Sequence, residues 1–271
     1  MFNSISTQAT ELLNLTNKAY FKSKTKVLAI TSGKGGVGKS TLSANIAYLF
    51  SRYGKNVCVL DADLGLANMQ ILFDLKPKFT FYDYIENGVL LENVLLKTKY
   101  PNITLCAGKS GHKYVSNNSS FVYSRVIKDI VALNRYDILL VDTGAGLNEY
   151  VQEFLDVSDE IIAITTTDPS ALTDVYALLK MVSNNKKQIF LAFNQTANYK
   201  IGATITKSLK DLAIKNKLNR NFMVKYVGNV VFDQNIATTG RLRKLFVKEF
   251  SGSVASLDLN KIVSYLVEEI K

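Results

Sequence analysis

The sequence has no tryptophan, one histidine, two cysteines and three prolines among its 271 residues. A single histidine, His112, argues against a zinc site, because such sites take several Cys or His ligands. Cys58 and Cys106 each lie in an apolar run, VCVLD and ITLCAG, and we expect both to be buried core side chains. So little cysteine excludes a disulfide-stabilised secreted domain and favours a reducing cytoplasm.

Long hydrophobic runs are also missing. No stretch approaches the roughly 20 consecutive apolar residues that a membrane-spanning helix needs. Residues 1–20 lack the basic start and the apolar core of a signal peptide. We therefore expect a cytoplasmic protein, and peripheral contact with the inner face of the cell membrane stays open.

Acidic residues are outnumbered. The chain has 33 Lys and Arg against 23 Asp and Glu, a formal net charge of +10. A nucleotide, DNA or a membrane surface could balance this charge, and simple solubility explains it equally well. The basic residues are concentrated between 200 and 248, with clusters at 207–217 (KSLKDLAIKNK) and 241–244 (RLRK).

Short apolar runs alternate with helix-period segments, a pattern typical of a parallel α/β sheet covered by helices on both faces. We predict strands at 26–31, 56–61, 102–107, 136–142, 160–166, 188–193 and 224–231, and helices at 39–53, 119–134, 147–156, 170–183 and 201–217. The 47% hydrophobic composition suits one α/β domain, at 26–257, preceded by a polar extension at 1–25.

Residues 258–271 form a predicted C-terminal amphipathic helix. Its apolar side carries Leu259, Ile262, Val263, Leu266, Val267 and Ile270. Helices that bind membrane surfaces favour basic residues beside the apolar side, but here Asp258, Glu268 and Glu269 offset the lysines. Docking on the protein's own core is therefore the favoured expectation.

The stretch ITSGKGGVGKST (30–41) follows a predicted strand and precedes a predicted helix. Gly33, Gly38, Lys39 and Ser40 fit the phosphate-loop pattern, in the strand–loop–helix context that the motif requires. Its glycines let backbone N–H groups turn toward phosphates, and the helix adds its positive N-terminal end. We expect Lys39 to contact the β- and γ-phosphates and the Ser40 hydroxyl to ligate Mg²⁺. The pattern leaves Lys34 unexplained.

Three carboxylates follow predicted strands. Asp142 ends the apolar strand of ILLVDTGAG, where phosphate-loop enzymes carry the carboxylate that holds the metal. Asp61 and Asp63 follow the second strand in LDADLGLAN, at the edge where ligands of doubly wound sheets bind. One of these two is expected to orient the attacking water, and a helix-cap or turn role stays open for the other.

The segment KGGVGKST resembles the deviant phosphate loop of the MinD/ParA ATPases, whose fold is a single-domain P-loop NTPase with a mostly parallel twisted sheet. In that family an extra lysine before the glycines reaches the phosphates of a second subunit in an ATP-bound homodimer. The resemblance implies this role for Lys34, and a second cation at the γ-phosphate would neutralise charge in the transition state.

The same resemblance implies slow, partner-stimulated hydrolysis of ATP to ADP and phosphate. It assigns catalysis to Lys34, Lys39 and Asp63, and the Mg²⁺ site to Ser40, Asp61 and Asp142. Nucleotide binding falls to Gly33, Gly35, Gly36, Val37, Gly38, Lys39, Ser40, Thr41 and Asn194. The segment FNQ (193–195) resembles the family's adenine-reading motif, and Asn194 would contact the base. An Asn that closes a strand into a turn explains this position nearly as well.

Residues 142–182, which include DTGAG and DPSALTDVYALLK, are similar to the FlhG (YlxH) branch of the family, whose members control flagellar number and placement. The expected partners are then the FlhF GTPase and the flagellar switch (C-ring) proteins. TQATELL (7–13) keeps Gln8, Ala9 and Leu12 of a short motif implied to stimulate FlhF, although Thr7 and Leu13 replace its charged positions.

Two related functions stay open: a ParA-type DNA-partition ATPase and a MinD-type ATPase that positions the division site. DNA is the less favoured partner, although the net charge permits it. We exclude the iron–sulfur reductases of this fold, because VDTGAG contains no cysteine and both cysteines lie in predicted strands. We also exclude the bacterial tyrosine kinases, because the chain has no tyrosine-rich C-terminal tail.

Overall fold

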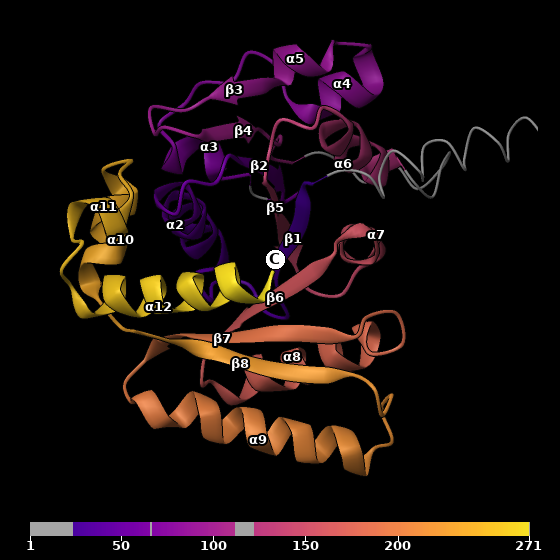
Figure 1. Ribbon diagram of the computed structural model, residues 1–271, viewed down its shortest axis with the longest axis vertical. Helices are drawn as coiled ribbons and strands as arrows, with labels where there is room; N and C mark the ends of the chain where they lie inside the picture. Colours follow the sequence, from indigo (N-terminus) through magenta and orange to yellow (C-terminus); the bar gives the residue numbers. More distant parts are fainter. Residues whose placement is uncertain (1–23, 66, 112–121, 271) are drawn as a thin grey trace, which may run out of the picture.

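The computed structural model describes residues 24–65, 67–111 and 122–270. Within them, eight strands form one sheet of order β3-β4-β2-β5-β1-β6-β7-β8 (Figure 1). Every neighbouring pair is parallel except β3–β4. The predicted α/β fold with a mostly parallel sheet is confirmed.

The strands are β1 (Lys26–Ser32), β2 (Val57–Ala62), β3 (Leu95–Lys97), β4 (Ile103–Cys106), β5 (Ile138–Ala145), β6 (Glu160–Thr165), β7 (Gln188–Thr196) and β8 (Met223–Val231). The helices are α2 (Lys39–Arg52), α3 (Met69–Leu72), α4 (Phe81–Asn87), α5 (Leu91–Val94), α6 (Val122–Ala132), α7 (Glu149–Val157), α8 (Pro169–Val182), α9 (Tyr199–Lys215), α10 (Gln234–Arg241), α11 (Phe246–Glu249) and α12 (Val254–Glu269).

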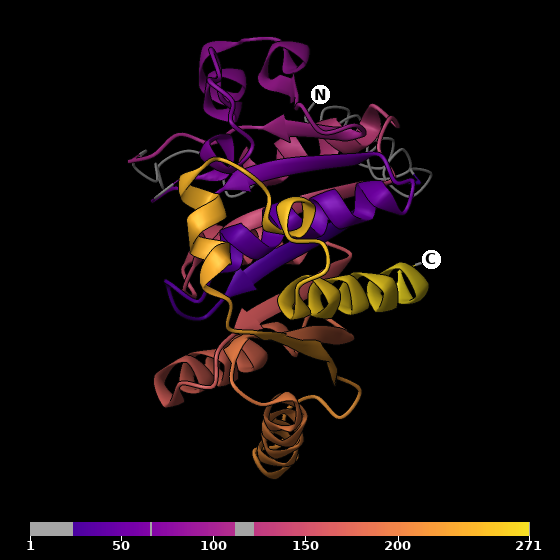
Figure 2. The ribbon, with the colours of Figure 1, turned by 90° about the vertical axis from the view of Figure 1, so that its left-hand side faces the viewer.

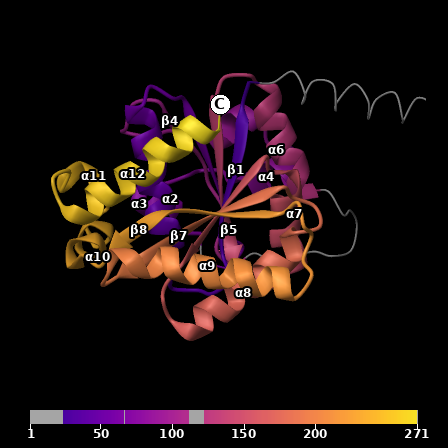
Figure 3. The same cartoon turned by 60° about the horizontal axis from the view of Figure 1, so that its bottom comes forward.

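Helices cover both faces of the sheet because its strands are apolar on both sides. Along β1, Leu28 and Ile30 belong to the core beneath α2 and α12. Val27 packs toward α6 and Ala29 toward α7 and α8, on the opposite face. Figure 3 shows α2 and α12 on one side of the strands and α6 and α7 on the other. Cys58 and Cys106 are fully buried in β2 and β4, as predicted.

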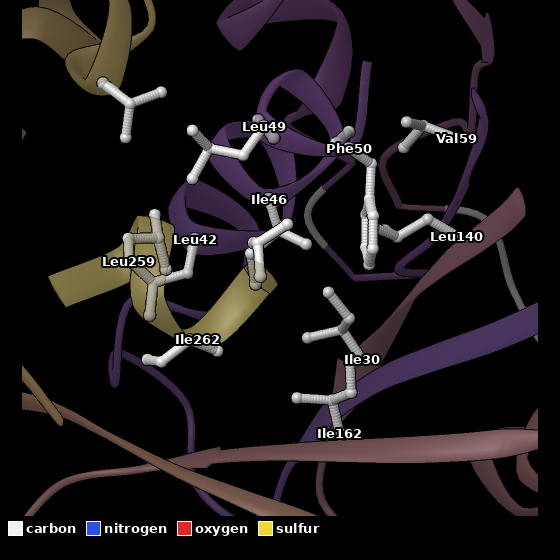
Figure 4. Close-up of a cluster of buried hydrophobic side chains, with 14 of the residues drawn as sticks. Ile30, Leu42, Ile46, Leu49, Phe50, Val59, Leu140, Ile162, Leu259 and Ile262 are labelled. Carbon is white, nitrogen blue, oxygen red and sulfur yellow. The ribbon is translucent and has the colours of Figure 1, made fainter. Parts of the chain in front are cut away.

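The C-terminal helix docks on the protein's own core. Leu259 and Ile262 join Leu42 and Ile46 of α2 in one buried cluster (Figure 4), and α12 runs beside α2 and β8 (Figure 2). The helix begins at Val254, earlier than the predicted residue 258. None of the described helices is long and apolar enough to span a membrane.

The predicted strands and long helices are all present, with ends shifted by a few residues. β3 and the short helices α3, α4, α5, α10 and α11 were not predicted, because segments this short show no clear periodicity. For α4 a signal was available. Thr80 and Asp83 form a capping box, in which Asp83 accepts a hydrogen bond from the Thr80 backbone N–H at 2.8 Å.

Candidate functional site

The phosphate loop joins β1 to α2 at the C-terminal edge of the sheet. Gly36 and Gly38 adopt left-handed backbone angles, with φ of 80° and 87°, which glycine adopts without steric cost. Gly38 is the N-cap of α2, no side chain of the described residues caps this helix, and its first turn has no acidic residue. The N–H groups and the positive end of α2 are therefore available to a phosphate.

A cavity of about 500 Å³ opens over this loop. Six residues from Gly35 to Thr41, all but Val37, form one wall together with Ser32. Asp63, Gly65, Asn68, Ala145 and Tyr150 complete its lining. Val37 is buried, and Gly33 sits so close to α8 that an added Cβ would lie 2.6 Å from the backbone of Asp174. Most of the predicted loop residues therefore line one cavity, and Gly33 and Val37 do not line it.

Lys39 and Asp142 form a buried ion pair beneath the loop. The Lys39 ammonium lies 3.0 Å from Asp142 Oδ1, and the two side chains are only 6% and 0% exposed. Lys39 also donates to the Ser40 hydroxyl at 3.2 Å, and the Ser43 hydroxyl donates to Asp142 Oδ1 at 2.6 Å. The other carboxylate oxygen, Oδ2 of Asp142, is buried without a hydrogen-bond partner among the described residues. A buried carboxylate oxygen of this kind is suited to contact a cation, or a hydrogen-bond donor from a ligand or a bound water.

Asp61 is the β2 neighbour of Asp142 across the sheet. It is fully buried, and Oδ2 accepts a hydrogen bond from the Met69 backbone N–H at 2.9 Å. Burial, and next the negative charge of Asp142, raise the pKa of Asp61 to about 7. The Asp61 carboxyl therefore titrates near neutral pH. A cation beside the carboxylates of Asp61 and Asp142 would favour the charged form of Asp61.

Asp63 lines the cavity itself. Its Oδ1 accepts a hydrogen bond from the Gly65 backbone N–H at 2.9 Å, which orders the loop that follows β2. Of the two neighbouring carboxylates, Asp61 is sealed in the core and Asp63 reaches the cavity. From the sequence, either of them could have had a role in a turn. In the structure, Asp63 both stabilises the turn at Gly65 and lines the cavity.

Asn194 lies behind the loop, only 3% exposed. Its Nδ2 donates to the Val37 carbonyl at 2.8 Å, and a Cβ added to Gly38 would lie 2.4 Å from the same Nδ2. Asn194 therefore supports the loop from β7, a role the sequence did not suggest. Its Oδ1 is buried without a partner among the described residues. Adenine recognition by Asn194 stays a prediction, in which this oxygen would accept from an amino group.

Lys34 is held outside the cavity by its own chain. Its ammonium donates to the Ser170 hydroxyl and lies 3.5 Å from Asp168 Oδ1, at the N-terminus of α8. Asp168 caps that helix by accepting from the backbone N–H groups of Ser170 and Ala171. Hydrogen bonds, first from the Ser170 hydroxyl, lower the pKa of Asp168 to about 2. Lys34 does not line the cavity, and its side chain is 43% exposed.

Several residues of the site escaped sequence analysis. Ser43 could have been found, because it lies one helical turn after Lys39 on the same buried face of α2. Asn68 lines the cavity from the loop after β2 and Tyr150 from the start of α7, and no motif singles them out. The predicted partner-binding residues Gln8, Ala9 and Leu12 lie outside the described residues, as does His112.

The residues present fit Mg²⁺ and a nucleoside triphosphate. Oxygen donors are what Mg²⁺ prefers, and Ser40 and Asp142 place a hydroxyl and a buried carboxylate with a free oxygen near Lys39. The open glycine turn and the uncapped N-terminus of α2 offer the backbone cradle that phosphates need. This geometry is that of a phosphate-binding site with a metal position beside it.

Comparisons with known proteins agree with this geometry. A family model described as "ParA: NUBPL iron-transfer P-loop NTPase" matches residues 23–267. The flagellum site-determining protein YlxH of Helicobacter pylori is 34% identical over 99% of this chain and 92% of its own length. The antiactivator FleN of Pseudomonas aeruginosa is 31% identical over 86% of this chain and 82% of its own.

Solved structures share the fold. The cell division ATPase MinD of Pyrococcus furiosus superposes with a TM-score of 0.77 at 20% identity, covering 90% of this chain and 99% of that one. MinD of Pyrococcus horikoshii, complexed with Mg-ADP, gives 0.75 at 22% identity, covering 89% and 96%. The chain therefore belongs to the ParA family of P-loop NTPases, and within it to the MinD-like ATPases that include YlxH and FleN.

Proposed function

We propose that this ATPase is a dimerisation switch that regulates the number or placement of flagella. The observation that carries the enzymatic part is the buried Lys39–Asp142 pair beneath an open glycine loop, with Asp63 in the same cavity. The flagellar part is supported by the likeness to YlxH, which extends over 99% of the chain. FlhF and the flagellar switch proteins are the partners we propose on the same ground.

Each side chain of the site has a proposed task. Lys39 exchanges its contact with Asp142 for the β- and γ-phosphates, and the α2 N–H groups bind the phosphate oxygens. Ser40, Asp142 and Asp61 hold Mg²⁺ or its water shell, and the ion supplies charge neutralisation at the phosphates. Asp63, which lines the same cavity, orients the attacking water.

Lys34 is proposed to act on the second subunit of an ATP-bound dimer. In this single chain it contacts α8 and does not line its own cavity. The contact that holds it is weak, because exposed ion pairs contribute only about 0–1 kcal/mol. The triphosphate of a second subunit can therefore attract Lys34 away from α8 at a small cost in free energy. Because the lysine then acts on the other subunit, hydrolysis depends on dimerisation.

We do not expect α12 to leave the core of the protein. Leu259, Ile262, Val263 and Leu266 are all buried, and exposing each of them to water would cost about 1.5–3 kcal/mol. Membrane contact through this face would therefore need a strong compensating interaction. We propose that the helix stays docked on α2 and β8 while the switch works.

The functional proposal is tested by deleting the gene in the organism that encodes the chain and counting flagella per cell by electron microscopy. We expect an altered number or position of flagella, restored by the wild-type gene but not by Lys39→Ala. Normal flagella in the deletion strain, together with faulty segregation of DNA, would contradict the proposal and favour a partition ATPase.

A further inference from the structure

A second cavity, of about 640 Å³, lies far from the phosphate loop, between α9 and β8. The last turns of α9, the connecting loop 216–222 and the first residues of β8 line it. Because β8 runs parallel to β7, β6 and β1, its first residues lie at the N-terminal edge of the sheet. The phosphate loop lies at the opposite edge. Figure 1 shows α9 and the loop that leads back to β8, and we call this cavity the α9–β8 groove.

Much of the lining of the groove is apolar. The apolar residues are Ala213, Ile214, Leu218, Phe222, Met223 and Val224. Two of these side chains are open to water, with Ile214 76% and Met223 51% exposed. Apolar side chains gathered in a concave site are typical of surfaces that bind a partner.

The rim of the groove is basic. Lys210, Lys217, Arg220 and Lys225 line it, and within the described part of the chain no carboxylate does. Lys225 pairs with Glu269 of α12. No ion pair joins Lys210, Lys217 or Arg220 to any other described residue. The groove therefore combines apolar lining with three positive charges that form no ion pair among the described residues.

Within the described part of the chain, the backbone beside the groove also has one side without a strand partner. β8 ends the sheet and, within the described residues, pairs only with β7. The outer N–H and C=O groups of an edge strand can bind an added peptide segment. A flat bilayer surface cannot enter a concave groove or use such groups. These features together favour a peptide over a lipid surface.

We propose that the α9–β8 groove binds a segment of a partner protein in which acidic and apolar side chains lie close together. The apolar side chains cover Ile214, Met223 and their neighbours, and the acidic ones pair with Lys210, Lys217 and Arg220. This inference goes beyond the switch proposed above and does not depend on ATP, because the groove and the phosphate loop lie at opposite edges of the sheet.

A random peptide library, displayed on phage, would be selected against the full-length protein. Its inserts are about 16 residues long, which is longer than the nine-residue strand β8 and therefore enough for an added strand. We expect the enriched peptides to be rich in Asp, Glu and large apolar residues. Their affinity is then measured by fluorescence anisotropy. Reversing the rim charges, in Lys210→Glu/Lys217→Glu/Arg220→Glu, should weaken binding by about tenfold or more. Ile214→Gln should weaken it without changing any charge.

A matched control changes the net charge by the same amount at three lysines of α9. Lys200→Glu/Lys207→Glu/Lys215→Glu alters exposed residues of α9 that do not line the groove, and should change the affinity by less than about threefold. ATP binding and thermal unfolding report whether each variant is folded. The wild-type protein should bind the peptides equally with and without ATP, which separates this test from that of the switch.

Three results would overturn the inference: enriched peptides without acidic bias, equal loss of affinity in both triple variants, or no loss in either. A fourth would replace it. Groove variants that keep peptide affinity but lose binding to phosphatidylglycerol–phosphatidylcholine vesicles would assign the rim to a lipid surface.

Discussion

Lys39→Ala is expected to abolish ATP binding at physiological concentrations. Hydrogen bonds to charged groups contribute about 1.5–3 kcal/mol each, so the loss of contacts to two phosphates lowers affinity about 100-fold or more. Isothermal titration calorimetry with ATP and Mg²⁺ measures this directly. Unchanged affinity would show that the phosphates bind elsewhere.

The same substitution also removes one partner of a buried ion pair, which typically costs about 3–5 kcal/mol of stability. A double variant separates the two effects. In Lys39→Ala/Asp142→Asn the buried charge is gone, and the amide oxygen can still accept from Ser43. We expect this protein to regain much of its thermal stability but no ATP binding. If stability returned together with ATP binding, the loss in the single variant would be one of folding alone.

Asp63→Ala is expected to keep ATP affinity within about threefold and to lower turnover by about 100-fold or more, the usual contribution of a positioned acid–base group. ATP-loaded dimers should then accumulate, which light scattering detects while phosphate release is followed in parallel. Asp63 lines the cavity but does not belong to the phosphate loop, which is why binding should survive.

The conservative variant Asp63→Asn serves as its control. An Asn side chain can still accept the hydrogen bond of the Gly65 N–H, so the loop after β2 should keep its conformation. A large loss of turnover in both variants would therefore report chemistry. If turnover fell in Asp63→Ala alone, the cause would be a change in the loop after β2. If both variants kept full turnover, Asp61 or another group would orient the attacking water.

The centre of the site could be predicted because the C-terminal ends of parallel strands meet at one edge of a sheet. Lys39 and Asp142 are far apart in the chain, yet a glycine loop after one strand and a carboxylate at the end of another were enough to place them together. Asp61 followed from the same argument, since it is the neighbour of Asp142 across β2 and β5.

Other features depend on packing that no local pattern encodes. The contact of Asn194 with Val37 needs the register of β7 against the loop, and the contact of Lys34 with Ser170 needs the place of α8. The α9–β8 groove likewise arises where a helix end, a loop and an edge strand meet. In the sequence, its lysines were indistinguishable from a solvated helix face.

The central claim is that Lys34 of one subunit completes the ATP site of the other, and mixing two inactive variants tests it most directly. Lys34→Ala and Asp63→Ala proteins are combined in equal amounts before ATP is added, and phosphate release is measured. In a symmetric dimer each mixed pair regains one intact site, so about a quarter of wild-type turnover should return. If Lys34 acts within its own subunit, every site stays defective, and a mixture as inactive as its components would contradict the account.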